Sequence, residues 1–147
     1  EYRHAKEVSD VAFRCAKAVG CNENLCLAAG FYYRMGRWLG EPYTQNAMVK
    51  AESLCFPEAL TQILYEYYGE EQALSTPESA LVHMVDAIVK KLEVMHKDVG
   101  NSQWNRDMLI YQTLNEFSST GLYDQSGMSM NQFLKAREFL AKEESLS

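Results

Sequence analysis

The sequence predicts an all-α protein, a compact single-domain bundle of about six to seven helices. Only three prolines and eight glycines interrupt its 147 residues, so long helices are expected. Apolar residues recur at three- and four-residue steps, and no segment has convincing strand-like alternation. Because 47% of the residues are hydrophobic, the chain can build a core without disulfides or a structural metal.

The first half of the chain predicts three helices. The first ends near Gly20, after an apolar stripe formed by Val8, Val11, Ala12, Cys15, Ala16 and Val19. Asn22 can cap a second helix, whose broad apolar surface from Leu25 to Met35 suits a central position. Thr44 is the expected cap of a short third helix that runs through Ser53.

The middle of the chain has the clearest helix starts. Pro57 and Glu58 are typical of a first turn and predict a fourth helix, with Gly69 as its end. Thr76-Pro77-Glu78 combines a cap, a proline and an acid, and opens a long helix with apolar residues on one side as far as Leu92.

The last third predicts a loop through Gly100 and Asn101 and then two more helices. These cover about Asn105–Phe117 and Ser129–Lys142. The chain contains no internal repeat and no low-complexity segment. The whole sequence is therefore expected to fold as one helical unit.

Composition narrows the classes of partner. The net charge of −6 argues against nucleic acid, whose partners need a cationic surface. No run approaches the roughly 18 apolar residues of a membrane span, so we expect no membrane contact by this segment. The polar start lacks the character of a signal peptide, which favours a cytoplasmic location. Because the chain begins with Glu1 rather than Met, we expect it to be part of a longer protein whose other domains are partners.

The four cysteines are interpreted as buried free thiols in a reducing cytosol. They lack the paired two-residue spacing of zinc ribbons. Three of them lie in apolar helical patterns, and the full set is Cys15, Cys21, Cys26 and Cys55.

Few residues offer chemistry by spacing alone. The sequence has neither a glycine-rich phosphate loop nor a nucleophile elbow. The only histidines are His4, His83 and His96, and His83 shares a helix face only with Asp86, at i and i+3. This pair fits a surface histidine beside an acid as well as a ligand pair. Two aromatic clusters, Phe31-Tyr32-Tyr33 and Tyr65-Glu66-Tyr67-Tyr68, fit core packing or a pocket for a planar ligand.

Four segments, taken in order, resemble a known family. EYRHAKEVSDVAFRCAKAVGCNENLCLAAGFYYRMGR contains His4 early, and FPEALTQILYEYYGEE contains Tyr67-Tyr68. ESALVHMVDAIVKKLE contains Asp86, and GLYDQSGMSMNQFLKAREFL lies near the end of the chain. The series resembles HD-superfamily phosphohydrolases, and most of all the cytoplasmic HD domain of bacterial membrane-anchored cyclic di-AMP phosphodiesterases. This implies an HD core over 1–98 with a C-terminal helical extension, 99–147, packed on it.

The resemblance also implies that most of the family's metal ligands are missing. His4 matches the first metal-binding His and Asp86 matches the late Asp. The His-Asp-x-Gly-Lys stretch is Tyr33-Arg34-Met35-Gly36-Arg37 here, and the double His is Tyr67-Tyr68. Met48 is matched to another ligand His. A neutral phenol is a poor ligand near neutral pH, and an arginine is permanently charged.

A physical hypothesis follows from the arginine. Without a metal, Asp86 would be an isolated carboxylate in a partly buried cavity, which is costly. Arg34 can restore the balance by placing its guanidinium where the metal stood. The alternative is that Arg34 points to solvent and Asp86 is hydrogen-bonded locally.

Two functions are weighed first. In one, the chain is a catalytically inactive HD-like domain that acts as a regulatory, ligand-sensing or structural module and has no cofactor. In the other, it is a metal-dependent phosphohydrolase with a rearranged site that holds Mn, Fe or Zn. The proposed ligands of that site are His4, His83 and Asp86, with additions from Glu52, Glu70 or Glu71.

A third interpretation keeps binding without hydrolysis. A nucleotide or other small anion would be held by arginine and lysine side chains, with tyrosines stacked on a base, and the candidates are Arg3, Arg34, Arg37 and Lys50. Trp38 and Trp104 are candidate anchors for a protein partner, and Trp38 can instead close off the old cavity. The sequence leaves the identity of the ligand and the oligomeric state open.

Overall fold

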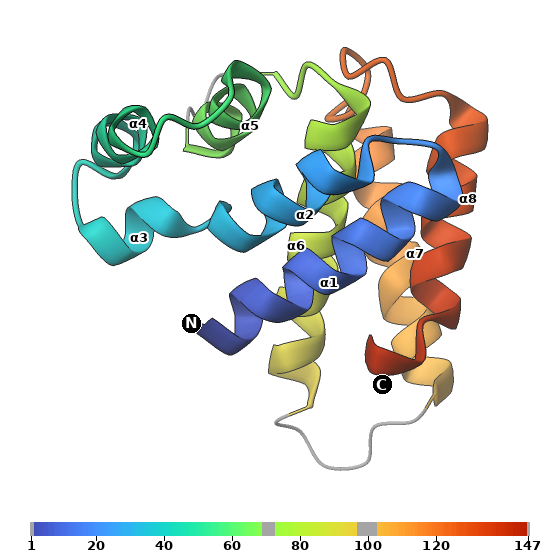
Figure 1. Cartoon of the computed structure of the whole chain (residues 1–147). Helices are drawn as coiled ribbons and strands as arrows, with labels where there is room; N and C mark the ends of the chain where they lie inside the picture. Colours follow the sequence, from blue (N-terminus) through green and yellow to red (C-terminus); the bar gives the residue numbers. More distant parts are fainter. Residues whose placement is uncertain (1, 69–72, 97–102, 147) are drawn as a thin grey trace.

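The structure, a computed structural model, describes residues 2–68, 73–96 and 103–146, and these residues are helical with short connections (Figure 1). The expected all-α class is confirmed. The elements in order are α1 Tyr2–Val19, α2 Glu23–Tyr32, α3 Met35–Leu39, α4 Tyr43–Ser53, α5 Glu58–Tyr68, α6 Pro77–Met95, α7 Gln103–Ser119, α8 Met130–Lys142 and the 3-10 turn η1 Glu144–Leu146.

Helix α6 is the centre of the fold. It packs against α1, α2, α5 and α7, and α1 also contacts α8. Figure 1 shows α1 crossing in front of α6, with α7 and α8 on one side and α3 and α4 on the other. Ten residues of α6 are buried, and Asp86 is the charged one among them. A buried carboxylate therefore lies on the central helix.

Helix α2 lies very close to α1. A Cβ atom added at Gly30 would lie 3.0 Å from the Cα of Ser9, so only glycine fits without a shift of the backbone. The Ser9 hydroxyl donates a 2.7 Å hydrogen bond to the carbonyl of Leu27. This crossing brings the end of α2, and with it Arg34, towards the first turns of α1.

Several helix starts follow the sequence prediction. The side chain of Asn22 accepts a hydrogen bond from the Leu25 N–H, and that of Thr76 accepts one from the Ser79 N–H. Ser129 forms a reciprocal capping box at the start of α8. These caps satisfy backbone donors that have no partner inside the helix.

Three local predictions need correction. Helix α4 begins at Tyr43, after Pro42, so Thr44 lies inside the first turn and is not the cap. Helix α5 begins at Glu58, and Pro57 precedes it. The second helix ends at Tyr32, because Arg34 has a non-helical backbone (φ −105°, ψ 18°). The predicted ends at Gly69, Gly100 and Asn101 lie outside the described residues.

The cysteines are free, but not all of them are buried. Cys15 and Cys26 are buried, Cys21 is half-buried and Cys55 is exposed. Cys55 lies in the turn between α4 and α5 with a φ of 56°, and that position faces solvent. Burial raises the pKa of the Cys15 thiol to about 12 and that of Cys21 to about 11, so both thiols stay protonated near neutral pH.

A buried carboxylate ties α5 to the start of α6. Glu66 is 4% exposed. Its oxygens accept hydrogen bonds from the Ser75 N–H at 3.0 Å, from the Ser75 hydroxyl, from the Ser79 hydroxyl at 2.6 Å and from the Gln62 amide at 2.9 Å. The donors come from α5, α6 and the residue before the α6 cap, so one side chain fixes this corner.

The C-terminal turn is held by two arginines. Arg106, 4% exposed, donates to the carbonyls of Ala141 and Glu143 at 2.7 Å each. Arg14 of α1 pairs with the carboxylate of Glu143. Leu146 then lies buried against the core. No helix within the described ranges is long and apolar enough to cross a membrane.

Candidate functional site: a charged network around Asp86

The buried carboxylate of Asp86 is held by two side chains from other helices. It is 4% exposed. Arg34, between α2 and α3, donates from Nε to Oδ1 and from Nη2 to Oδ2, each at 2.9 Å. His4 Nε2 lies 2.8 Å from Oδ1. The ion pair between Arg34 and Asp86 expected from the sequence is therefore present, in its two-bond form.

His4 links the network to a second acid. Its Nδ1 lies 2.7 Å from Oε1 of Glu93, while Nε2 faces Asp86. A doubly protonated imidazolium ring can donate to both carboxylates at once. Burial alone would lower the pKa of His4, but the hydrogen bonds and charges of Asp86 and Glu93 raise it above the usual value. The network thus joins the side chains of Arg34 and His4 to the carboxyl groups of Asp86 and Glu93.

The same partners stabilise the ionised form of Asp86. Burial would raise the pKa of this carboxyl, but the hydrogen bonds from His4 and Arg34, and their charges, bring it below the usual value. Asp86 is therefore a carboxylate at neutral pH, and both of its oxygens are already engaged.

Two tyrosines lie beside this network. The rings of Tyr33 and Tyr67 are 4.3 Å apart between centroids, and the Arg34 guanidinium lies 6.0 Å from the Tyr67 ring centroid. Tyr33 is 1% exposed, and burial raises the pKa of its phenol well above the usual value. In the part of the chain that the structure describes, its hydroxyl has no hydrogen-bond partner. The side chain of Tyr68 lies outside the described residues.

His83 belongs to a different cluster. Its Nδ1 lies 3.1 Å from the Tyr123 hydroxyl. Its ring packs against the rings of Phe117 and Tyr123, with centroid distances of 5.0 and 5.8 Å. Burial lowers the pKa of His83. The alternative ligand set of His4, His83 and Asp86 is therefore not assembled, because the connection before α8 engages the His83 ring.

Some of the remaining candidates lie on other surfaces, and some fall outside the described residues. Met48 and Glu52 line a groove of about 440 Å³ between α4 and α5, and Glu70 and Glu71 fall outside the described residues. The Arg37 guanidinium is 5.9 Å from the Tyr43 ring centroid. Lys50 and Trp38 are exposed, on α4 and α3. The side chain of Trp104 is not described.

A polar cavity of about 500 Å³ opens beside the network. Among the predicted residues, Arg3, His4 and Arg34 line it. The sequence prediction missed four of its charged or titratable residues, Glu7, Lys90, Glu93 and His96. The last three lie at the C-terminal end of α6 or at its cap. Their i, i+3 and i+6 spacing puts them on the same helix face as Asp86. The sequence does not show which helices pack against that face, so this spacing alone did not identify them as site residues.

The donor set around Asp86 does not fit a divalent cation. Metal ligands must offer lone pairs, yet both oxygens of Asp86 accept hydrogen bonds and both nitrogens of His4 face carboxylates. A guanidinium also occupies the space beside the carboxylate. Over the described ranges, no group of three or more His, Cys, Asp or Glu residues is arranged to hold a metal ion.

Comparison with known proteins places the fold. No family model and no curated protein matches the sequence. Among solved structures, the HD domain of the L. monocytogenes phosphodiesterase PgpH in complex with cyclic-di-AMP is similar, with a TM-score of 0.80 and 14% identity over 95% of this chain and 88% of that chain. A further crystal structure of that domain has a TM-score of 0.79 and 14% identity, over 95% of this chain and 89% of that chain. The chain therefore has the HD-domain fold.

Proposed function

We propose that this chain is an HD-like domain that does not hydrolyse phosphodiesters and acts as a regulatory, ligand-sensing or structural module. We further propose a cytoplasmic location, either in a soluble protein or as the cytoplasmic part of a membrane protein. The observation that carries this proposal is the two-bond contact of Arg34 with Asp86, with His4 on the same carboxylate.

The electrostatics of the network support the loss of metal chemistry. A phosphohydrolase of the metal-dependent type uses the ion to polarise the phosphoryl group and to activate water. Here an ion at Asp86 would meet the permanent positive charge of Arg34 and would have to displace its guanidinium from both carboxylate oxygens. The phenol of Tyr33 offers no compensating anionic ligand, since burial keeps it protonated.

The ligand class is proposed from the fold neighbour and the cavity together. The similar HD domain of PgpH was solved with cyclic-di-AMP, and the cavity beside the network is lined by several cationic side chains. A nucleotide or other small anion is therefore the ligand that we expect this module to sense.

Hydrolysis of cyclic di-AMP in the presence of Mn²⁺ or Fe²⁺ tests the proposal. We expect no turnover by the purified protein and no stoichiometric metal by elemental analysis. The metal-dependent alternative predicts turnover that disappears in Asp86→Asn and persists in Asp124→Asn, a matched change at an exposed aspartate. That pattern would contradict the proposed function.

A further inference from the structure

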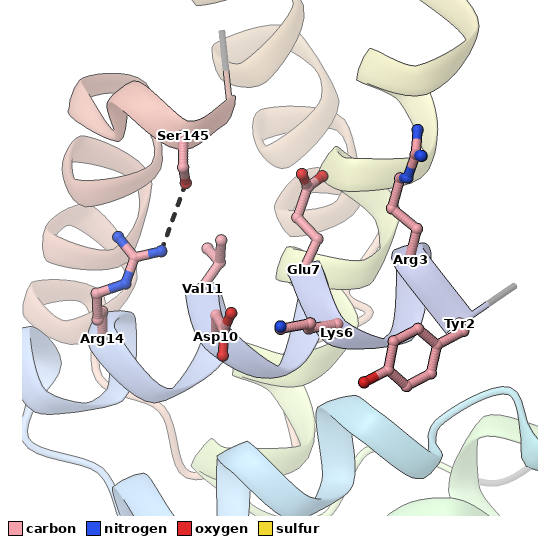
Figure 2. A pocket seen from close by; sticks show the side chains of 8 residues that line it. All are labelled: Tyr2, Arg3, Lys6, Glu7, Asp10, Val11, Arg14 and Ser145. Atoms are coloured by element: carbon pink, nitrogen blue, oxygen red, sulfur yellow. Dashed lines mark hydrogen bonds between the residues drawn. The ribbon is translucent and has the colours of Figure 1, made fainter.

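Besides Arg34, three parts of the chain form the walls of the cavity beside the network. Arg3 and Glu7 come from α1, Lys90 and His96 from α6 and its cap, and Ser145 from η1. Figure 2 shows that Arg3 and Glu7 extend from the same side of α1, towards α6, while Lys6 and Tyr2 lie on another side. Arg3, Glu7 and Ser145 also border a shallower groove of about 400 Å³ along α1.

The charges of this cavity are unevenly balanced. Glu93 is engaged by His4, whose Nδ1 lies 2.7 Å from its Oε1, and Arg34 is paired with Asp86. Lys90 and Arg3 are exposed, and neither side chain has a hydrogen bond or ion pair within the part of the chain that the structure describes. Against these two cations stands Glu7. Among the described residues, the wall outside the network thus offers the positive charges of Arg3 and Lys90 and the His96 ring against the carboxyl group of Glu7.

We propose that this cavity binds the terminal phosphate monoester of a small ligand, held mainly by Arg3 and Lys90. The inference rests on the proposed function, because it assigns the ligand class of a module that binds without hydrolysis. Arginine presents a planar fork that matches phosphate oxygens, and lysine acts as a compact point charge. The volume lies within the roughly 300–1,000 Å³ typical of small-molecule sites.

A monoester suits these charges better than a cyclic diester. A terminal phosphate carries about −1.5 to −2 charges near neutral pH, so one group can satisfy both Arg3 and Lys90. Each phosphate of a cyclic dinucleotide carries a single charge, so one of the two cations would be left less fully paired.

Glu7 limits the affinity. Burial and the charge of Glu93 raise the pKa of its carboxyl, although His4 and His96 oppose that shift. When it is ionised, Glu7 repels an incoming anion. Glu7→Gln is therefore expected to tighten phosphate binding, which is the opposite of the effect of losing a cation.

Calorimetric titration of the full chain with adenosine 5′-monophosphate and with inorganic phosphate, in buffer that contains a chelator, tests the inference. We expect saturable binding that weakens about tenfold in Lys90→Gln and in Arg3→Gln and strengthens in Glu7→Gln. Lys91→Gln is the matched control, because it removes the same charge from the adjacent exposed residue, which does not line the cavity.

Three results would overturn the inference. The first is that neither probe binds. The second is an equal loss of phosphate affinity in Lys90→Gln and in Lys91→Gln. The third is tighter binding of cyclic di-AMP than of the monophosphate. The chelator separates this test from that of the proposed function. A metal-dependent hydrolase would be detected in the turnover assay, whereas these variants report only on anion binding.

Discussion

Asp86 and Glu66 are two buried acids that the fold stabilises by different means. Each is 4% exposed, and each has a pKa below its usual value. Asp86 is held by the charged groups of Arg34 and His4, whereas the Glu66 carboxylate accepts hydrogen bonds from neutral donors, including Ser75 and Ser79.

The difference shows which partners each buried carboxylate needs to stay ionised. Neutral donors from adjacent segments are enough to hold Glu66, because hydrogen bonds to the ionised form offset the cost of burial. Asp86 lies on the central helix, where no backbone N–H is available, so its charge needs counter-charges from α1 and from the α2–α3 break. The Asp86 network is therefore a set of opposed charges, whereas Glu66 joins α5 to the start of α6 through neutral donors.

The largest effect is expected from Arg34→Leu. This change leaves Asp86 buried beside a single partner, and breaking a buried pair typically destabilises by about 3–5 kcal/mol. Chemical denaturation, with the free energy of unfolding extrapolated to water, measures it. Asp86→Leu added to Arg34→Leu should recover part of the loss, because no unpaired charge then remains. A double variant as unstable as the sum of the two single variants would contradict the pairing.

Glu66→Gln should have a smaller effect, about 2 kcal/mol. The amide keeps one acceptor oxygen but loses the charge that strengthens the hydrogen bonds from Ser75 and Ser79. Denaturation of Gln62→Ala serves as the comparison, since it removes a single donor and should cost less. A neutral outcome for Glu66→Gln would show that the carboxylate charge does not matter at this corner.

The two sites should also differ in their dependence on pH. The lowered pKa values of Asp86 and Glu66 mean that their stabilisation is present above the unfolded values of 3.8 and 4.5 and is lost as pH falls through the folded values. The raised pKa of His4 acts in the opposite direction, because its stabilisation is present below 6.5 and is lost as pH rises through the folded value.

Denaturation midpoints measured across about pH 3 to 9 separate these contributions. His4→Gln should lose the decline in stability above 6.5, the usual pKa of histidine, and keep the decline on the acidic side. Glu66→Gln should flatten the acidic side alone. An alkaline decline that is unchanged in His4→Gln would argue against a protonated imidazole in the network.

Ser79→Ala is expected to give the smallest effect, about 1 kcal/mol. It removes one neutral donor to Glu66 and leaves the backbone N–H that Thr76 caps. Denaturation of Ser53→Ala is the control, because that exposed serine bonds only to a nearby carbonyl of its own helix. A loss of stability larger than that of Glu66→Gln would mean that Ser79 acts through something other than the Glu66 carboxylate.

The sequence predicted the elements that carry local signals. Thr76 and Asn22 act as caps because their side chains bond to N–H groups three residues on, a requirement that depends on sequence spacing alone. The pair of Arg34 and Asp86 was predicted from the resemblance together with a charge argument. It could be predicted because an unpaired buried carboxylate is so costly.

The features that the sequence did not predict depend on tertiary contacts, which leave no local pattern in the sequence. No proline or glycine marks the break at Tyr33 and Arg34, where the arginine turns towards a residue 52 positions along the chain. Periodicity counts apolar residues, so it did not identify Glu66 as buried or Glu93 as a partner of His4. Thr44 was mistaken for a cap because Pro42 already starts that helix.

Calorimetric titration of the purified protein with Mn²⁺ at neutral pH tests most directly whether counter-charges, rather than a metal, balance Asp86. We predict no binding that depends on Asp86: any weak heat should be the same in the protein and in Asp86→Asn. Stoichiometric binding that is abolished by Asp86→Asn and by His4→Gln would contradict the account.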